Sequence, residues 1–153
     1  MVNAKLQAYS KCREKIRALC HGESNEIALM ASVVGVLHNE FPEFFWTGFY
    51  RMVDGQLVIG PYQGTVGCLR IDLGRGVCGV AAESGQTQVV PDVHEFPGHI
   101  ACDARSQSEI VVPVRNRSRA LIGVLDVDST EKNQFCEIDR EQLEGILSEV
   151  FGA

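Results

Sequence analysis

The chain has 153 residues, of which 45% are hydrophobic and 22% are charged, with a formal net charge of −6. A chain of this length and composition is expected to fold as one domain without disulfide staples or a structural metal. The acidic balance argues against a nucleic-acid partner, which would need a basic face, and no apolar run approaches the roughly 18–20 residues needed to span a membrane.

The first 42 residues predict two helices. Residues 3–20 carry apolar side chains at near-helical spacing, and Ser24 is a plausible N-cap for a second helix. Pro42 prevents that helix from continuing. The second helix has apolar side chains along one face, which are Ile27, Met30, Ala31, Val34 and Leu37.

The middle of the chain predicts strands, because the hydrophobic period changes after Pro42. Residues 44–53 are rich in aromatic and β-branched side chains, and Asp54-Gly55 links them to a second run at 56–59. This arrangement is a strong hairpin signal. Further elements follow as a strand at 68–73, a short helix at 77–83, a short strand at 87–90 and an irregular loop at 92–103.

The last third predicts two strands, at 109–114 and 121–127, and a final helix capped by Asp139. The sum is an α+β domain with a central, mostly antiparallel sheet of about six strands flanked by helices. We expect one domain over residues 1–153, with an N-terminal helix in residues 1–22 and the core of the domain in residues 24–151.

The six cysteines are expected to be reduced thiols, because no secretory segment precedes them, and the cytoplasm is the expected compartment. None forms a CxxC pair, and their spacing matches no common zinc signature. A zinc site that includes His94 and His99 stays open as a weaker alternative. Packing in the core is the expectation for Cys12, Cys20 and Cys136.

The other three cysteines lie where either packing or redox chemistry is possible. Cys68 follows a glycine-rich turn, and Cys78 begins the short helix, where the helix N-terminus would lower the pKa of its thiol. Cys102 lies in the irregular loop, close in sequence to His99 and Arg105. An exposed cysteine beside such groups is a candidate reactive thiolate.

Three acidic residues occupy positions that packing alone does not favour. Asp126 and Asp128 alternate along one strand and therefore share a face. If Glu109 lies on a neighbouring strand, three carboxyl groups meet, and crowding raises the pKa of at least one, so that it can donate a proton. The cluster could also hold an ammonium group. A solvated strand face, or a turn cap at Asp128, is the alternative.

Trp46 and Tyr50 are four residues apart in one predicted strand, so they also share a face. Core packing accounts for this pattern, and an apolar wall for a small ligand is the functional interpretation.

Three segments of the chain together resemble one family, which is the free methionine-(R)-sulfoxide reductase family, built on a GAF domain. They are residues 74–79 (GRGVCG), 92–103 (DVHEFPGHIACD) and 108–113 (SEIVVP). The resemblance extends to residues 45–50 (FWTGFY) and 123–129 (GVLDVDS) and covers roughly residues 25–150. The loop motif is long, and the three-cysteine pattern distinguishes this family from a generic GAF module.

The resemblance implies a role for each of the candidate site residues. Cys102 matches the catalytic cysteine, Cys68 the principal resolving cysteine, and Cys78 a third cysteine with an auxiliary or alternative role. The acidic substrate-site residues of the family correspond to Glu109, Asp126 and Asp128, and the aromatic residues around the methyl end of the substrate correspond to Trp46 and Tyr50. No metal or organic cofactor is expected.

The implied activity is the thiol-dependent reduction of free L-methionine-(R)-sulfoxide to L-methionine. Cys102 would attack the sulfoxide sulfur while Glu109 protonates its oxygen, which leaves Cys102 as a sulfenic acid. Cys68 would then form a disulfide with Cys102, and thioredoxin would reduce it. The loop at 92–103 is expected to move during this cycle. The family also suggests a homodimer.

A non-catalytic GAF sensor that binds a cyclic nucleotide or a tetrapyrrole is the competing interpretation, because fold alone does not determine function. Two expectations disfavour it. No output domain is expected to follow the GAF region, and the cluster of carboxyl groups suits an ammonium ligand better than a phosphate.

Overall fold

The computed structural model describes residues 2–152. Its α-helices are α1 (Val2–Cys20), α2 (Glu26–Glu40), α3 (Gly76–Ser84) and α4 (Glu137–Leu147), with a 3₁₀ turn at Val93–Glu95 and a π-helical turn at Ser148–Gly152. Its strands are β1 (Trp46–Val53), β2 (Gln56–Gln63), β3 (Arg70–Ile71), β4 (Gln88–Val90), β5 (Ser108–Arg115) and β6 (Leu121–Ser129).

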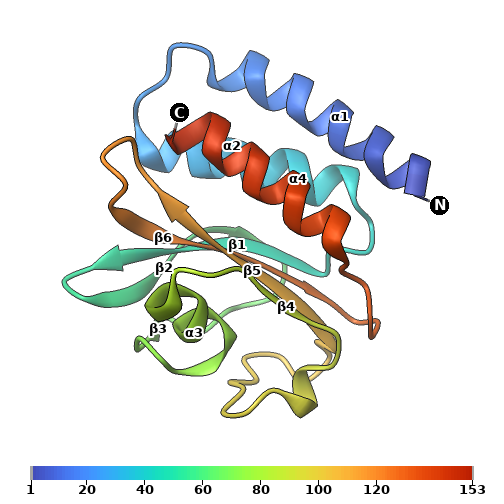
Figure 1. Cartoon of the computed structure of the whole chain (residues 1–153), viewed down its shortest axis with the longest axis vertical. Coiled ribbons are helices and arrows are strands. Elements are labelled where there is room, and N and C mark those ends of the chain that lie inside the picture. Colours follow the sequence, from blue (N-terminus) through green and yellow to red (C-terminus); the bar gives the residue numbers. More distant parts are fainter. Residues whose placement is uncertain (1, 153) are drawn as a thin grey trace.

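The strands form one sheet in the order β3-β2-β1-β6-β5-β4, and every neighbouring pair is antiparallel. α2 and α4 cover one face of this sheet, with α1 packed on their outer side, and α3 lies on the other face (Figure 1). The predicted α+β architecture and its six-stranded antiparallel sheet are confirmed.

The sheet separates two apolar clusters because successive side chains of a strand point to opposite faces. On β6, Leu125 and Val127 pack beneath α2 and α4, whereas Val124 packs against α3 on the other side. Asp126 and Asp128 lie two and four residues after Val124, so their side chains point to the same face as that of Val124. The alternation therefore directs both carboxyl groups toward the α3 face, away from the larger core.

Two predicted helix caps are wrong. Asn25, not Ser24, caps α2, because its side chain accepts the Ala28 amide hydrogen at 3.1 Å. α4 begins at Glu137 after Cys136, and Asp139 lies inside the first turn, where it accepts the Cys136 amide at 2.8 Å. The buried Asp139 carboxylate is also engaged from α1, by the hydroxyl of Tyr9 and the ammonium of Lys5.

The prediction that Cys12, Cys20 and Cys136 pack in the core is confirmed for the first two residues. Cys12 is fully buried, which raises the pKa of its thiol to about 12, and Cys20 is half-buried against the same core. Cys136 is exposed, so the packing prediction is wrong for this residue. Its position as the cap before α4 leaves the side chain at the surface.

The predicted strand at 68–73 is shorter than expected. Only Arg70 and Ile71 pair, with Val58 and Leu57 of β2, at the edge of the sheet. Cys68 therefore lies in the loop that leads into β3. Within residues 2–152, no helix combines the length and the apolar character needed to cross a bilayer.

Candidate active site

Three adjacent strands bring the acidic residues together. In the β5–β6 pair, Glu109 lies directly opposite Asp128, and in the β1–β6 pair, Asp128 lies opposite Trp46. Asp126 lies two residues before Asp128 on the same face of the sheet. The prediction that these three carboxyl groups share one small region is confirmed.

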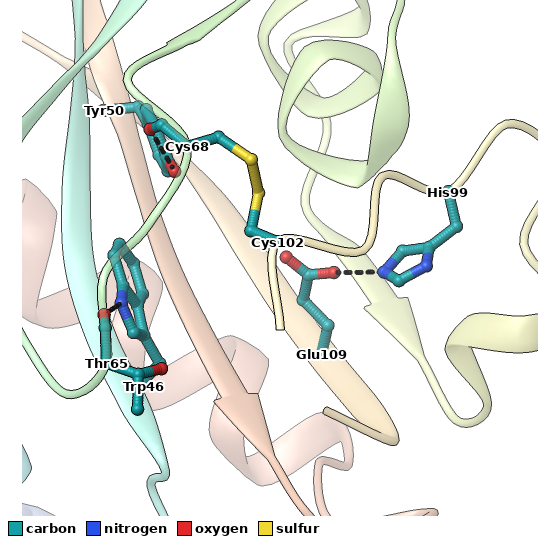
Figure 2. The surroundings of a disulfide bond; sticks show 7 residues. All are labelled: Trp46, Tyr50, Thr65, Cys68, His99, Cys102 and Glu109. Carbon is teal, nitrogen blue, oxygen red and sulfur yellow. Dashed lines mark hydrogen bonds and ion pairs between the residues drawn. A yellow bond between two sulfur atoms is a disulfide. The ribbon is translucent and has the colours of Figure 1, made fainter. Parts of the chain in front are cut away.

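Glu109 is the strongest candidate for a proton donor. Its side chain is buried, and desolvation, followed by the nearby charges of Asp126 and Asp128, raises its pKa well above the usual range for a glutamate. Such surroundings favour the protonated form of the carboxyl group, which can donate a proton. His99 faces it, with 3.8 Å between His99 Nε2 and Glu109 Oε1, and burial lowers the pKa of this imidazole (Figure 2).

Of the three carboxyl groups, Asp126 is the strongest candidate for the ionised form. Burial raises its pKa, but hydrogen bonds from Glu109 and Cys78 oppose that rise. The pKa of Asp128 is raised well above its usual range, mainly by desolvation. Asp126 Oδ1 is buried and has no hydrogen-bond partner among the described residues. A buried carboxylate oxygen of this kind is suited to accept a hydrogen bond from a cationic ligand.

Cys78 is the third residue of α3, and the prediction that the helix N-terminus lowers its pKa is wrong. The thiol is buried, and desolvation together with the charge of Asp126 raises its pKa well above the usual value. Its Sγ lies within 4.8 Å of a carboxylate oxygen of Asp126. Cys78 is therefore a neutral hydrogen-bond donor in this state and a poor nucleophile.

Cys68 and Cys102 form a disulfide, with 5.6 Å between their Cα atoms (Figure 2). Cys68 comes from the loop before β3, and Cys102 from the irregular loop that precedes β5. The hydroxyl of Tyr50 donates to the Cys68 carbonyl oxygen at 3.0 Å, which anchors one side of this bridge to the sheet. The structure thus joins two cysteines that are 34 residues apart.

Trp46 lines the cavity beside the carboxyl groups, whereas Tyr50 does not. The two rings stack with 6.0 Å between centroids, which confirms that they share a face. The Trp46 indole N–H donates to the Thr65 carbonyl oxygen at 2.7 Å. Its ring also lies across Gly48, where a β-carbon would collide with it. Glycine at this position therefore allows the indole to lie flat against the sheet.

The zinc alternative is not supported by this arrangement. His94 is exposed and contacts Asp92, while His99 faces Glu109. Among the described residues, one group has ligand atoms within 4.8 Å of one another, and it consists of Cys78, Glu109 and Asp126. A metal would require these groups to be deprotonated, but burial raises the pKa of all three.

The cavity enclosed by these residues has a volume of about 50 Å³. It is lined on one side by the carboxyl groups and α3, and on the other by the two cysteine loops. The two cysteine loops, which the disulfide joins, therefore form one wall of the cavity.

Comparison with known proteins identifies the family. The GAF domain family model matches residues 25–150. The chain is 47% identical to Protein YtsP of Bacillus subtilis, over 88% of this chain and 83% of that protein. It is 41% identical to the free methionine-R-sulfoxide reductase of Escherichia coli, over 95% of this chain and 88% of the relative.

A solved structure shows the same similarity. The free methionine-R-sulfoxide reductase of Neisseria meningitidis, in complex with its substrate, is 41% identical with a TM-score of 0.87, over 93% of this chain and 85% of that one. The chain belongs to the free methionine-(R)-sulfoxide reductase family. As in the rest of this family of oxidoreductases, its fold is that of a GAF domain.

Two residues of this site, Thr65 and Asp103, were not predicted from the sequence. Thr65 Oγ1 donates to Asp103 Oδ2 at 2.9 Å, which connects the two cysteine loops. Asp103 is also paired with Arg105, whose guanidinium lies 5.0 Å from the centre of the Phe45 ring. Thr65 and Asp103 are 38 residues apart, and no spacing pattern in the sequence indicates their contact.

Redox state is expected to control ligand binding at this site. The reduced protein should bind free methionine with a Kd at least ten-fold lower than the oxidised protein, because the disulfide fixes the Cys68 and Cys102 loops, which form one wall of the cavity. Quenching of Trp46, the single tryptophan of the chain, measures binding with and without dithiothreitol. Cys102→Ser is the control, since it should bind equally in both conditions. Equal affinity of the two wild-type forms would contradict gating.

Proposed function

We propose that this protein reduces free L-methionine-(R)-sulfoxide to L-methionine, with Cys102 as the nucleophile and Glu109 as the general acid. The single observation that carries the proposal is the Cys68–Cys102 disulfide beside a buried carboxyl group with a raised pKa. The names of the relatives support the same activity.

The chemistry begins when the Cys102 thiolate attacks the sulfoxide sulfur. The S–O bond breaks as Glu109 delivers a proton to the oxygen, which is transferred to the Cys102 sulfur. The substrate sulfur gains two electrons and leaves as methionine, while Cys102 is oxidised to a sulfenic acid. Cys68 then attacks the Cys102 sulfur, and water is released as the disulfide forms.

Specificity for the free amino acid follows from charge. Asp126 is the candidate partner for the ammonium group of a free substrate, and Asp128 lies beside it on the same face of β6. A peptide-linked residue lacks that group, so these buried carboxyl groups would stay unpaired at a cost of several kcal/mol. Trp46 is the candidate partner for the methyl end, because sulfur–aromatic contact contributes about 0.3–1.5 kcal/mol. Tyr50 would act indirectly, by holding the Cys68 loop.

Recycling requires a dithiol, and we propose thioredoxin for this role, in a reducing compartment such as the cytoplasm. Cys78 has a positioning role in this proposal, as the neutral donor that holds Asp126. A homodimer stays a prediction.

The deciding test is methionine release from the separate R and S epimers of free L-methionine sulfoxide, with dithiothreitol as reductant. We expect release from the R epimer alone, and at least 100-fold less from an N-acetylated substrate. No methionine from either epimer with fully reduced protein would overturn the proposal. A thermal shift with cyclic nucleotides in that case would favour the sensor interpretation.

A further inference from the structure

We propose that the apolar rim formed by Val66, Leu69 and Ile100 is the docking surface for the dithiol protein that reduces the Cys68–Cys102 disulfide. This inference rests on the proposed function, because it concerns the step that regenerates the reduced enzyme. The rim is defined by these three side chains and is assigned to a partner of the thioredoxin class, whose thiol must reach one of the two sulfurs.

The three rim residues are close to the disulfide by chain connectivity alone. Leu69 is the neighbour of Cys68, Val66 lies two residues before Cys68, and Ile100 lies two residues before Cys102. Consecutive Cα atoms are about 3.8 Å apart, so each rim residue has its Cα within about 7.6 Å of a bridged cysteine. The two cysteine Cα atoms are 5.6 Å apart, so all three rim residues lie close to the bridge.

The rim is unusually exposed for apolar side chains. The exposed fractions are 80% for Val66, 73% for Leu69 and 37% for Ile100. Single exposed apolar residues need no explanation, but a group of them around a reactive site indicates an interaction surface. Cys102 is itself exposed, and Cys68 is half-buried.

The rim also lacks charge. Residues 64–69 and 98–102 contain no lysine, arginine, aspartate or glutamate, although 22% of the whole chain is charged. The nearest acidic side chain along the second segment, Asp103, is already paired with Arg105. On the other side, Arg70 follows Leu69 and is exposed. A partner with an uncharged, apolar surface around its thiol would therefore meet apolar side chains at the bridge, with this arginine at the edge of the rim.

The exchange itself requires contact with this rim. A thiolate of the partner attacks one sulfur of the bridge, a mixed disulfide forms, and the other cysteine leaves as a thiolate. The second thiol of the partner then attacks the mixed disulfide, which releases the remaining cysteine. Two electrons pass from the dithiol to the bridge. A small thiol can react without covering the rim, whereas a protein must bury part of it.

This difference provides the test. Leu69→Glu introduces a charge beside the bridge at a residue that does not line the substrate cavity. With thioredoxin, thioredoxin reductase and NADPH as the reducing system, we expect the KM for thioredoxin to rise at least ten-fold. With dithiothreitol, the rate should stay within two-fold of wild type. Leu69→Lys should act in the same direction, since either charge disrupts an apolar contact.

The matched control is Leu19→Glu, because Leu19 on α1 is 62% exposed and outside the site. An unchanged KM for thioredoxin in both Leu69 variants would overturn the docking surface, as would failure of thioredoxin to support wild-type turnover that dithiothreitol supports. A change from dimer to monomer in Leu69→Glu, measured by light scattering, would assign the rim to a second copy of the chain. Loss of wild-type activity with dithiothreitol would instead refute the proposed function.

Discussion

Replacing Cys102 with serine is expected to abolish methionine formation, with a loss of roughly 10³-fold or more, because a serine hydroxyl is not ionised near neutral pH and no adjacent base activates it. The measurement is single turnover of reduced protein without external reductant. Wild type should release one methionine per chain and close the Cys68–Cys102 bridge.

Companion variants separate the roles of the other two thiols. Cys68→Ser should still release one methionine but stop at a sulfenic acid on Cys102, which a dimedone adduct would reveal by mass spectrometry. Cys78→Ser is the matched control, because it keeps a hydrogen-bond donor to Asp126 and should still form the bridge. Methionine release from Cys102→Ser at a rate near that of wild type would contradict the assignment of the nucleophile.

Replacing Glu109 with glutamine is expected to lower kcat by about 10²–10⁴-fold, which is the usual contribution of a general acid. The pH profile provides the more specific readout. In wild type, the rate should fall as pH rises through the raised pKa of Glu109, because only the protonated form can serve the sulfoxide oxygen. The variant should lose that descending limb. Glu141→Gln, an exposed change on α4, is the control.

Stability should change in the opposite direction to activity. A carboxyl whose pKa is raised in the folded state binds its proton more tightly there, so its contribution to stability is complete below the unfolded pKa and is lost as pH rises through the folded pKa. Glutamine cannot ionise. Glu109→Gln should therefore raise Tm relative to wild type more at pH 9 than at pH 5, by about 2–4 °C for each kcal/mol gained. Equal shifts at both pH values would contradict a protonated Glu109.

The local features of the fold could be predicted from the sequence because they depend on short-range periodicity. Alternation along one strand indicated that Asp126 and Asp128 share a face, and Asp54-Gly55 indicated the first hairpin. Helix ends were less predictable. Ser24 and Asn25 are both good capping residues, and only the hydrogen bond to Ala28 distinguishes them.

The residue types and their order along the chain were enough by themselves to indicate the α+β fold and, through the resemblance of several segments, the family. The tertiary structure decided which groups meet and how strongly they are desolvated. Cys78 illustrates the difference, because its place at a helix start predicted a lowered pKa, whereas burial against Asp126 raises it. The contact between Thr65 and Asp103, and the cavity lined by both cysteine loops, likewise depend on the packing of distant loops, which no local pattern records.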